Sequence, residues 1–129
     1  MPAGPPSTLV TDPDAAAALF RDLVAEPHEQ AAVLYLDPQW RFLGRSVFVG
    51  SRHAVAPSLR AIFAEALRLD AAALILGHTH TTGCSNPSPA DLAYTRALVR
   101  VATALEVTVA DHLILAGGHV TSFRAMGLL

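Results

Sequence analysis

The chain has 129 residues, of which 52% are hydrophobic and 16% charged, and its formal net charge is −2. This length suits one domain, and the composition excludes a disordered chain, because disorder requires few apolar groups and a high net charge. Dispersed basic residues make nucleic-acid binding unlikely on charge grounds, and the apolar segments are shorter than the about 18 residues of a membrane helix. A single cysteine, Cys84, and an N-terminus without an apolar leader predict a cytoplasmic location.

The first half of the chain contains a flexible segment, a helix and a hairpin. Residues 1–12 are expected to be flexible, and the domain is expected to cover residues 13–129. An Asp cap, an early proline and apolar residues at helical spacing predict a helix over Pro13–Glu26. Two apolar runs, Ala31–Asp37 and Arg41–Gly50, flank an Asp-Pro turn signal and therefore predict a β-hairpin.

The second half alternates helices with strands. An apolar stripe predicts a helix over Val55–Asp70, and the unbroken apolar run Ala71–Gly77 predicts a central strand covered on both faces. Residues His78–Pro87 are expected to form a loop, because small, polar and proline residues dominate them. A helix and two strands complete the pattern, at Pro89–Glu106, Val107–Ala116 and His119–Phe123. Together these elements predict one α/β domain, with a mixed β-sheet flanked by helices in two or three layers.

Three potential metal ligands follow the predicted central strand. His78 and His80 are two residues apart, and in extended backbone such residues point to the same side, so both imidazoles can reach one ion. Asp91 lies in the first turn of the next helix and can supply a third, oxygen ligand. Two histidines and one carboxylate leave a fourth zinc position open for water, as a hydrolase requires. A carboxylate that does not bind the metal is also needed, and Glu29 is the candidate general base.

A purely structural interpretation accounts for part of this pattern. Ser88, Pro89 and Asp91 form a typical helix start, with a serine N-cap, an early proline and a capping box. An isolated H-x-H pair is a weak signal, because loops contain histidines by chance. His112, inside an apolar strand, is expected to be a hydrogen-bonded core histidine rather than a ligand. Zinc deaminases are excluded, because the H-x-E and P-C-x-x-C motifs are absent.

The combination of these residues is more specific than any one of them. His78-Thr-His80, seven residues and then Ser88-x-x-Asp91 match the H-x-H-x(7)-S-x-x-D motif, so the chain resembles the JAMM (MPN+) metalloproteases. It is most similar to their bacterial branch, the RadC-like proteins. Glu29, eight residues before the end of the first strand, stands where that family has its catalytic glutamate. Agreement extends to four further strings: Thr95-Arg96, Asp111-His112-Leu113-Ile114, Ser122-Phe123 and the terminal Gly127-Leu128-Leu129.

The resemblance, which runs from about Glu29 to Leu129, implies a fold and a site. The fold would be a single MPN/JAB-type domain, which is cytidine deaminase-like. Zn²⁺ would be bound by His78, His80 and Asp91. Glu29 would activate the water, and Ser88 would donate a hydrogen bond to the developing oxyanion. The activity would be that of a zinc-dependent metallopeptidase or isopeptidase acting on a peptide or protein substrate.

Two other functions stay open at this point. Many domains of this fold lack the motif and are non-catalytic interaction modules, whereas this chain retains every motif residue, which favours chemistry. The historical naming of the family connects it with DNA repair, and full-length members carry an N-terminal helix-hairpin-helix region. This chain has only about one helix there, and its dispersed charge predicts no phosphate-binding surface.

The loop after the central strand departs from the usual family pattern. Family members usually have H-N-H-P-S-G, whereas this chain has H-T-H-T-T-G followed by Cys84. Cys84 is either a small loop residue or a soft zinc ligand, and the first interpretation is favoured. Substrate specificity is expected to depend on two loops beside the zinc site, Ser51–Ala56 and Thr81–Pro87.

Overall fold

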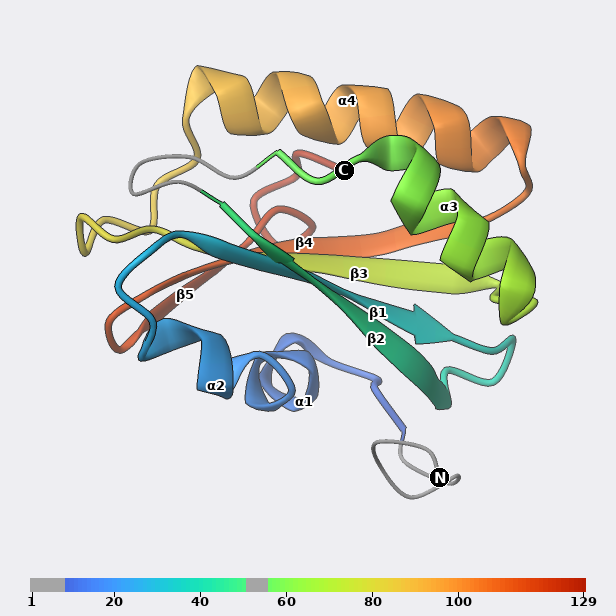
Figure 1. The fold of residues 1–129 in the computed structure, drawn as a ribbon, viewed down its shortest axis with the longest axis horizontal. Coiled ribbons are helices and arrows are strands. Elements are labelled where there is room, and N and C mark those ends of the chain that lie inside the picture. The colour runs from blue at the N-terminus through green and yellow to red at the C-terminus, as the bar shows by residue number, and fades with distance from the viewer. Residues whose placement is uncertain (1–8, 51–55) are drawn as a thin grey trace.

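The computed structural model describes residues 9–50 and 56–129 and contains one mixed five-stranded sheet with helices on both faces (Figure 1). The sheet has the order β2-β1-β3-β4-β5. Its strands are β1 (Gln30–Leu36), β2 (Phe42–Val49), β3 (Ala73–Thr79), β4 (Thr108–Ala116) and β5 (His119–Ser122). The helices are α1 (Pro13–Ala18), α2 (Arg21–Val24), α3 (Leu59–Arg68) and α4 (Pro89–Ala104). The predicted α/β fold with a mixed sheet is therefore confirmed.

The sheet separates two apolar cores. Helices α1 and α2 lie on one face, and α3 and α4 lie on the other (Figure 1). Because successive strand residues point to opposite faces, each buried strand contributes to both cores. Phe20 packs with Leu34 on the first face, whereas Ile62 and Leu98 pack with Leu76 on the second. The arrangement has three layers, and β3 lies at its centre with every residue buried.

The pairing of the strands brings the end of β3 close to the start of α4. Strand β1 pairs antiparallel with both β2 and β3, which confirms the predicted hairpin. Strands β3 and β4 run parallel, and α4 is the connection that a parallel pair requires. In open α/β sheets, ligands usually bind beyond the carboxyl ends of such strands. The candidate site lies at this end.

The single helix predicted over Pro13–Glu26 is wrong, because the chain breaks it into α1 and α2. Asp12 caps α1, where the Ala15 N–H donates to its Oδ1 at 2.7 Å. The break between the two helices places Phe20 in the core against Gly77. A Cβ at position 77 would lie 2.7 Å from the Phe20 ring, so this contact requires glycine. Tertiary packing has overridden a continuous helical pattern.

The central strand extends two residues beyond its predicted end. Strand β3 starts at Ala73 and continues to Thr79, so His78 lies in the strand and is buried. The ladder continues because His78 pairs with Ala31 of β1 and with Ile114 of β4. The predicted loop boundary at position 78 is therefore wrong. The apolar residues of the sequence end at Gly77, but the backbone pairing of β3 with its neighbours continues through the polar residue His78.

The helix predicted over Val55–Asp70 is shorter in the structure, and the other predicted strands and the last helix differ by one or two residues at their ends. Helix α3 starts at Leu59, after Ser58, whose hydroxyl caps it; Val55, where the predicted helix began, lies outside the described residues. Most of the segment expected to be flexible, residues 1–8, also lies outside them, whereas Val10 is buried. Over the ranges 9–50 and 56–129, no helix combines the length and the apolar character needed to cross a membrane.

Candidate metal centre

Three potential ligands converge at the carboxyl end of β3. The Nε2 atoms of His78 and His80 are 2.9 Å apart, and each lies 3.2 Å from an oxygen of Asp91. In a tetrahedral zinc site with bonds of about 2.0–2.1 Å, ligand atoms lie roughly 3.3 Å from one another. Imidazole nitrogen and carboxylate oxygen are also suitable zinc donors. Both the spacing and the chemistry of the donor set therefore fit one metal ion.

The extended backbone of β3 places the two histidines on one side. Thr79, between them, points the other way, and its Oγ1 accepts a hydrogen bond from the Gln30 N–H at 3.0 Å. The His80 N–H donates to the Leu115 carbonyl at 3.0 Å, which keeps the chain straight just beyond the strand. The alternation predicted from the H-x-H spacing is present in the structure.

Asp91 belongs to the capping box of α4 and to the candidate centre at the same time. The Ser88 N–H donates to Asp91 Oδ2 at 2.8 Å, and the Asp91 N–H donates to Ser88 Oγ at 3.0 Å. The structural and the metal-binding interpretations of Asp91 are therefore compatible.

His80 is oriented by the loop that follows it. Its Nδ1 lies 2.8 Å from the carbonyl oxygen of Cys84. A carbonyl only accepts hydrogen bonds, so Nδ1 carries a proton, and in the neutral form of the ring Nε2 presents its lone pair to the centre. The exposed Cys84 thus contacts His80 through its backbone. Its thiol is not part of the metal-capable group that the described residues contain.

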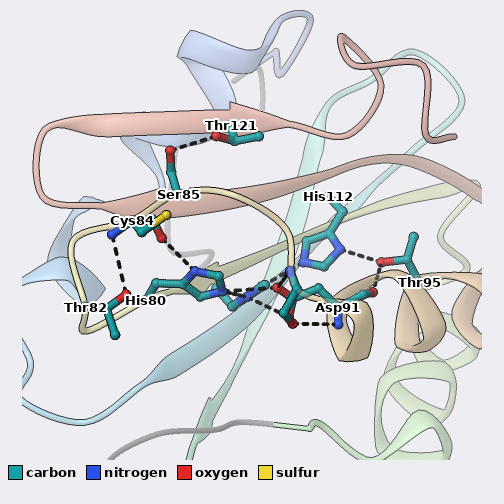
Figure 2. A network of polar contacts seen from close by, with 10 residues as sticks. His80, Thr82, Cys84, Ser85, Asp91, Thr95, His112 and Thr121 are labelled. Atoms are coloured by element: carbon teal, nitrogen blue, oxygen red, sulfur yellow. Dashed lines mark hydrogen bonds and ion pairs between the residues drawn. The ribbon is translucent and has the colours of Figure 1, made fainter.

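His112 is buried and hydrogen-bonded, as the sequence predicted, but its partner is the candidate ligand His78. Its Nε2 lies 2.7 Å from Nδ1 of His78. Its Nδ1 lies 2.6 Å from Oγ1 of Thr95, and Figure 2 shows this second contact. Burial lowers the pKa of His112 to about 3, which keeps the ring neutral at neutral pH. The sequence analysis missed this contact, and the only available signal was that Thr95 and His112 both lie in strings shared with the family.

Glu29 lies immediately before β1 and faces the same cavity. Its side chain is buried, and the Gly50 N–H fixes its backbone by donating to its carbonyl at 2.9 Å. The structure gives the Glu29 carboxylate no hydrogen bond or ion pair within residues 9–50 and 56–129. The cavity measures about 480 Å³, and the site residues that line it are Glu29, His78, His80, Ser88, Asp91 and His112. The structure therefore brings all five sequence-predicted site residues to one cavity.

Of the two loops expected to determine substrate specificity, the structure describes only the second in full. Residues 51–55 of the first lie outside the described part of the chain. The second loop is tied to β5, where the Thr121 hydroxyl donates to Ser85 Oγ at 2.8 Å (Figure 2). Thr82 and Cys84 lie in this loop and line the same cavity as His80.

Residues 10–128 match the RadC-like JAB domain family. The chain belongs to this family. A UPF0758 protein of Methylibium petroleiphilum is 43% identical to this RadC-like chain over 108 residues, covering 83% of the chain and 49% of the relative. A UPF0758 protein of Thermosynechococcus vestitus is 40% identical over 119 residues, covering 91% and 48%. The RadC-like chain thus spans about half the length of these curated relatives.

Proposed function

We propose that this RadC-like domain is a zinc-dependent metallopeptidase or isopeptidase whose substrate is a peptide or protein. One observation carries the proposal: His78, His80 and Asp91 converge within 3.2 Å at a cavity that Glu29 also lines. Structural zinc sites are normally closed by four protein ligands, whereas catalytic sites use three and keep one position open. The described residues offer three ligands, so the donor set fits a catalytic site.

A zinc ion held by His78, His80 and Asp91 would lower the pKa of a water molecule to about 7 and polarise the substrate carbonyl. Glu29 then acts as the general base that accepts the proton of this water. The same carboxyl group passes the proton to the leaving amine, as the hydrolysis of an amide requires. Its burial and its lack of a partner in the described chain keep the carboxylate available for both transfers.

Ser88 stabilises the negative charge that develops on the carbonyl oxygen. Its Oγ accepts from the Asp91 N–H, which leaves its own proton available for donation into the cavity. Removing one such donor from an acyl-transfer enzyme costs about 10²–10³ in kcat. The serine therefore combines helix capping with oxyanion stabilisation, and no exchange of partners is needed between the two roles.

Metal content and peptide cleavage test the proposal together. Wild type dialysed without chelator should hold about one zinc per chain by elemental analysis, as one three-ligand site requires. Zinc-loaded wild type should generate new termini in a mixture of proteome-derived peptides, measured by mass spectrometry. Glu29→Gln should keep the zinc and lose roughly 10²–10⁴ in turnover, because it removes the general base.

Glu106→Gln is the matched control. Glu106 is exposed just beyond the far end of α4, so this variant should keep both zinc and turnover. Wild-type turnover in Glu29→Gln would contradict the assignment of the base. A wild type that binds no zinc even when zinc is added back would contradict the metal site itself.

A further inference from the structure

We propose that Thr95 and His112 are positioning residues that determine which nitrogen of His78 faces the metal. The inference rests on the metal site proposed above and assigns a role to two buried residues outside the ligand set. Thr95 lies one helical turn after Asp91 in α4, and His112 lies in β4 beside β3. Three hydrogen bonds join them into a relay that starts at Asp91 and ends at His78.

The direction of this relay is set at its first hydrogen bond. Thr95 Oγ1 lies 2.8 Å from the backbone carbonyl oxygen of Asp91. A carbonyl cannot donate, so the hydroxyl of Thr95 must be the donor, and it uses its one hydrogen in this bond. Thr95 Oγ1 is then an acceptor toward His112, whose Nδ1 lies 2.6 Å away and must carry a proton.

The remaining steps follow from the burial of His112. The ring is 1% exposed and stacks on Phe123 with centroids 4.2 Å apart, an apolar setting that disfavours a charged imidazole. A neutral imidazole protonated on Nδ1 accepts at Nε2, so His78 donates its Nδ1–H to His112 at 2.7 Å. Neutral His78 therefore presents the lone pair of its Nε2 to the centre.

Asp91 lies at both ends of the relay. Its backbone carbonyl starts the relay, and its carboxylate lies 3.2 Å from the Nε2 atom whose protonation the relay controls. Figure 2 shows Asp91, Thr95 and His112 linked in this order. The two lone pairs on His78 and His80 and the Asp91 carboxylate then face one point with no internal proton donor between them. Such a point attracts a cation from outside, which is a metal ion or, in competition with it, a proton.

Zinc affinity tests the relay without reference to turnover. Thr95→Val removes the hydroxyl at nearly constant shape, so His112 loses its Nδ1 partner and is free to protonate Nε2 instead. His78 would then carry its proton on the metal-facing side. We expect a 10–100-fold weaker zinc dissociation constant, measured by competition with a chromogenic chelator. Thr95→Ser keeps the hydroxyl and should restore affinity to within about threefold of wild type.

Thr103→Val is the matched control for the same chemical change. Thr103 lies on the same helix, and its Oγ1 makes the same type of bond, to the Val99 carbonyl at 2.8 Å, but it is exposed and far along α4 from the centre. This variant should bind zinc as wild type does. Equal affinities for Thr95→Val and Thr103→Val would overturn the relay.

Nitrogen-15 NMR of the histidine rings gives a second readout that does not depend on metal binding. In the metal-free wild type near pH 8, His112 and His78 should both carry a proton on Nδ1, and Thr95→Val should shift His112 toward the Nε2-protonated form. An Nε2-protonated His112 in wild type would overturn the relay even if zinc binds. A wild type with the expected ring protonation but no zinc affinity would instead overturn the proposed function.

Discussion

The two candidate histidine ligands face the same point but are supported very differently. His78 lies inside β3, and its support is the relay of His112 and Thr95, which are 1% and 3% exposed. His80 lies just beyond the strand, and its support is one carbonyl of the exposed Cys84 in the following loop. The centre therefore has a core-supported half, built around His78, and a loop-supported half, built around His80. Changes in the loop can alter the second half while the first keeps its geometry.

The largest expected effect separates the two halves by alanine substitution. His78→Ala and His80→Ala should both abolish stoichiometric zinc binding, because each removes one of three ligands. In the metal-free state, however, His78→Ala should lower the free energy of unfolding by about 2–4 kcal/mol, since it opens a cavity and leaves Nε2 of the buried His112 without its partner. His80→Ala should cost less than about 1 kcal/mol, as its supporting loop is exposed. Urea unfolding without metal measures the difference, and equal losses would contradict the comparison.

The next effect concerns Ser88, which lies where the loop enters α4. Ser88→Ala should reduce kcat by about 10²–10³ through loss of the oxyanion donor. It should also destabilise the protein by about 1 kcal/mol through loss of the N-cap. Ser58→Ala removes the equivalent cap of α3, where the Ala61 N–H donates to Ser58 Oγ at 3.2 Å, and should cost similar stability without lowering kcat. A parallel fall of kcat in both variants would reduce Ser88 to a helix cap.

Zinc loading should strengthen the loop-supported half more than the core-supported half. At a free zinc concentration of 100 times the dissociation constant, binding adds about 2.7 kcal/mol to the free energy of unfolding. Amide hydrogen exchange should slow mainly over residues 80–86, because β3 and β4 are already buried in the metal-free protein. Uniform protection across the site would indicate that both halves are equally ordered before zinc binds.

The smallest effect is expected at Cys84. Cys84→Ser keeps the backbone carbonyl that accepts from His80 and removes only an exposed thiol outside the metal-capable group. The zinc dissociation constant should therefore stay within about twofold of wild type. A tenfold weaker dissociation constant by chelator competition would instead identify the thiol as a soft zinc ligand.

Local signals in the sequence were sufficient to predict the convergence of the site. The H-x-H spacing and the helix start at Ser88 are local properties, and both hold in the structure, whereas the polarity change after the central strand placed the strand end two residues too early. Glu29 was assigned through its place relative to the first strand and the family motif, and the structure brings it to the same cavity. Its role as general base stays a prediction until turnover is measured.

Features that depend on pairing between distant segments could not be predicted in this way. The contact of His112 with His78 depends on the parallel register that places Leu76 opposite His112, which no local pattern encodes. The split of the first helix depends on the space that Gly77 leaves for Phe20, fifty-seven positions away in the chain. Both features are determined by tertiary packing, and the amphipathic periodicity of the sequence does not report on such packing.

The candidate general base and the candidate metal ligands belong to different structural units. All three ligands and both relay residues come from one continuous stretch, residues 78–112, that spans the end of β3, the helix α4 and part of β4. Glu29 comes from the antiparallel hairpin on the other side of β3. Under the mechanism proposed above, an exchange at position 29 would remove turnover and leave the metal ligands unchanged. A hydrolase and a metal-holding scaffold without activity would thus be separated by one codon, and either could arise from the other.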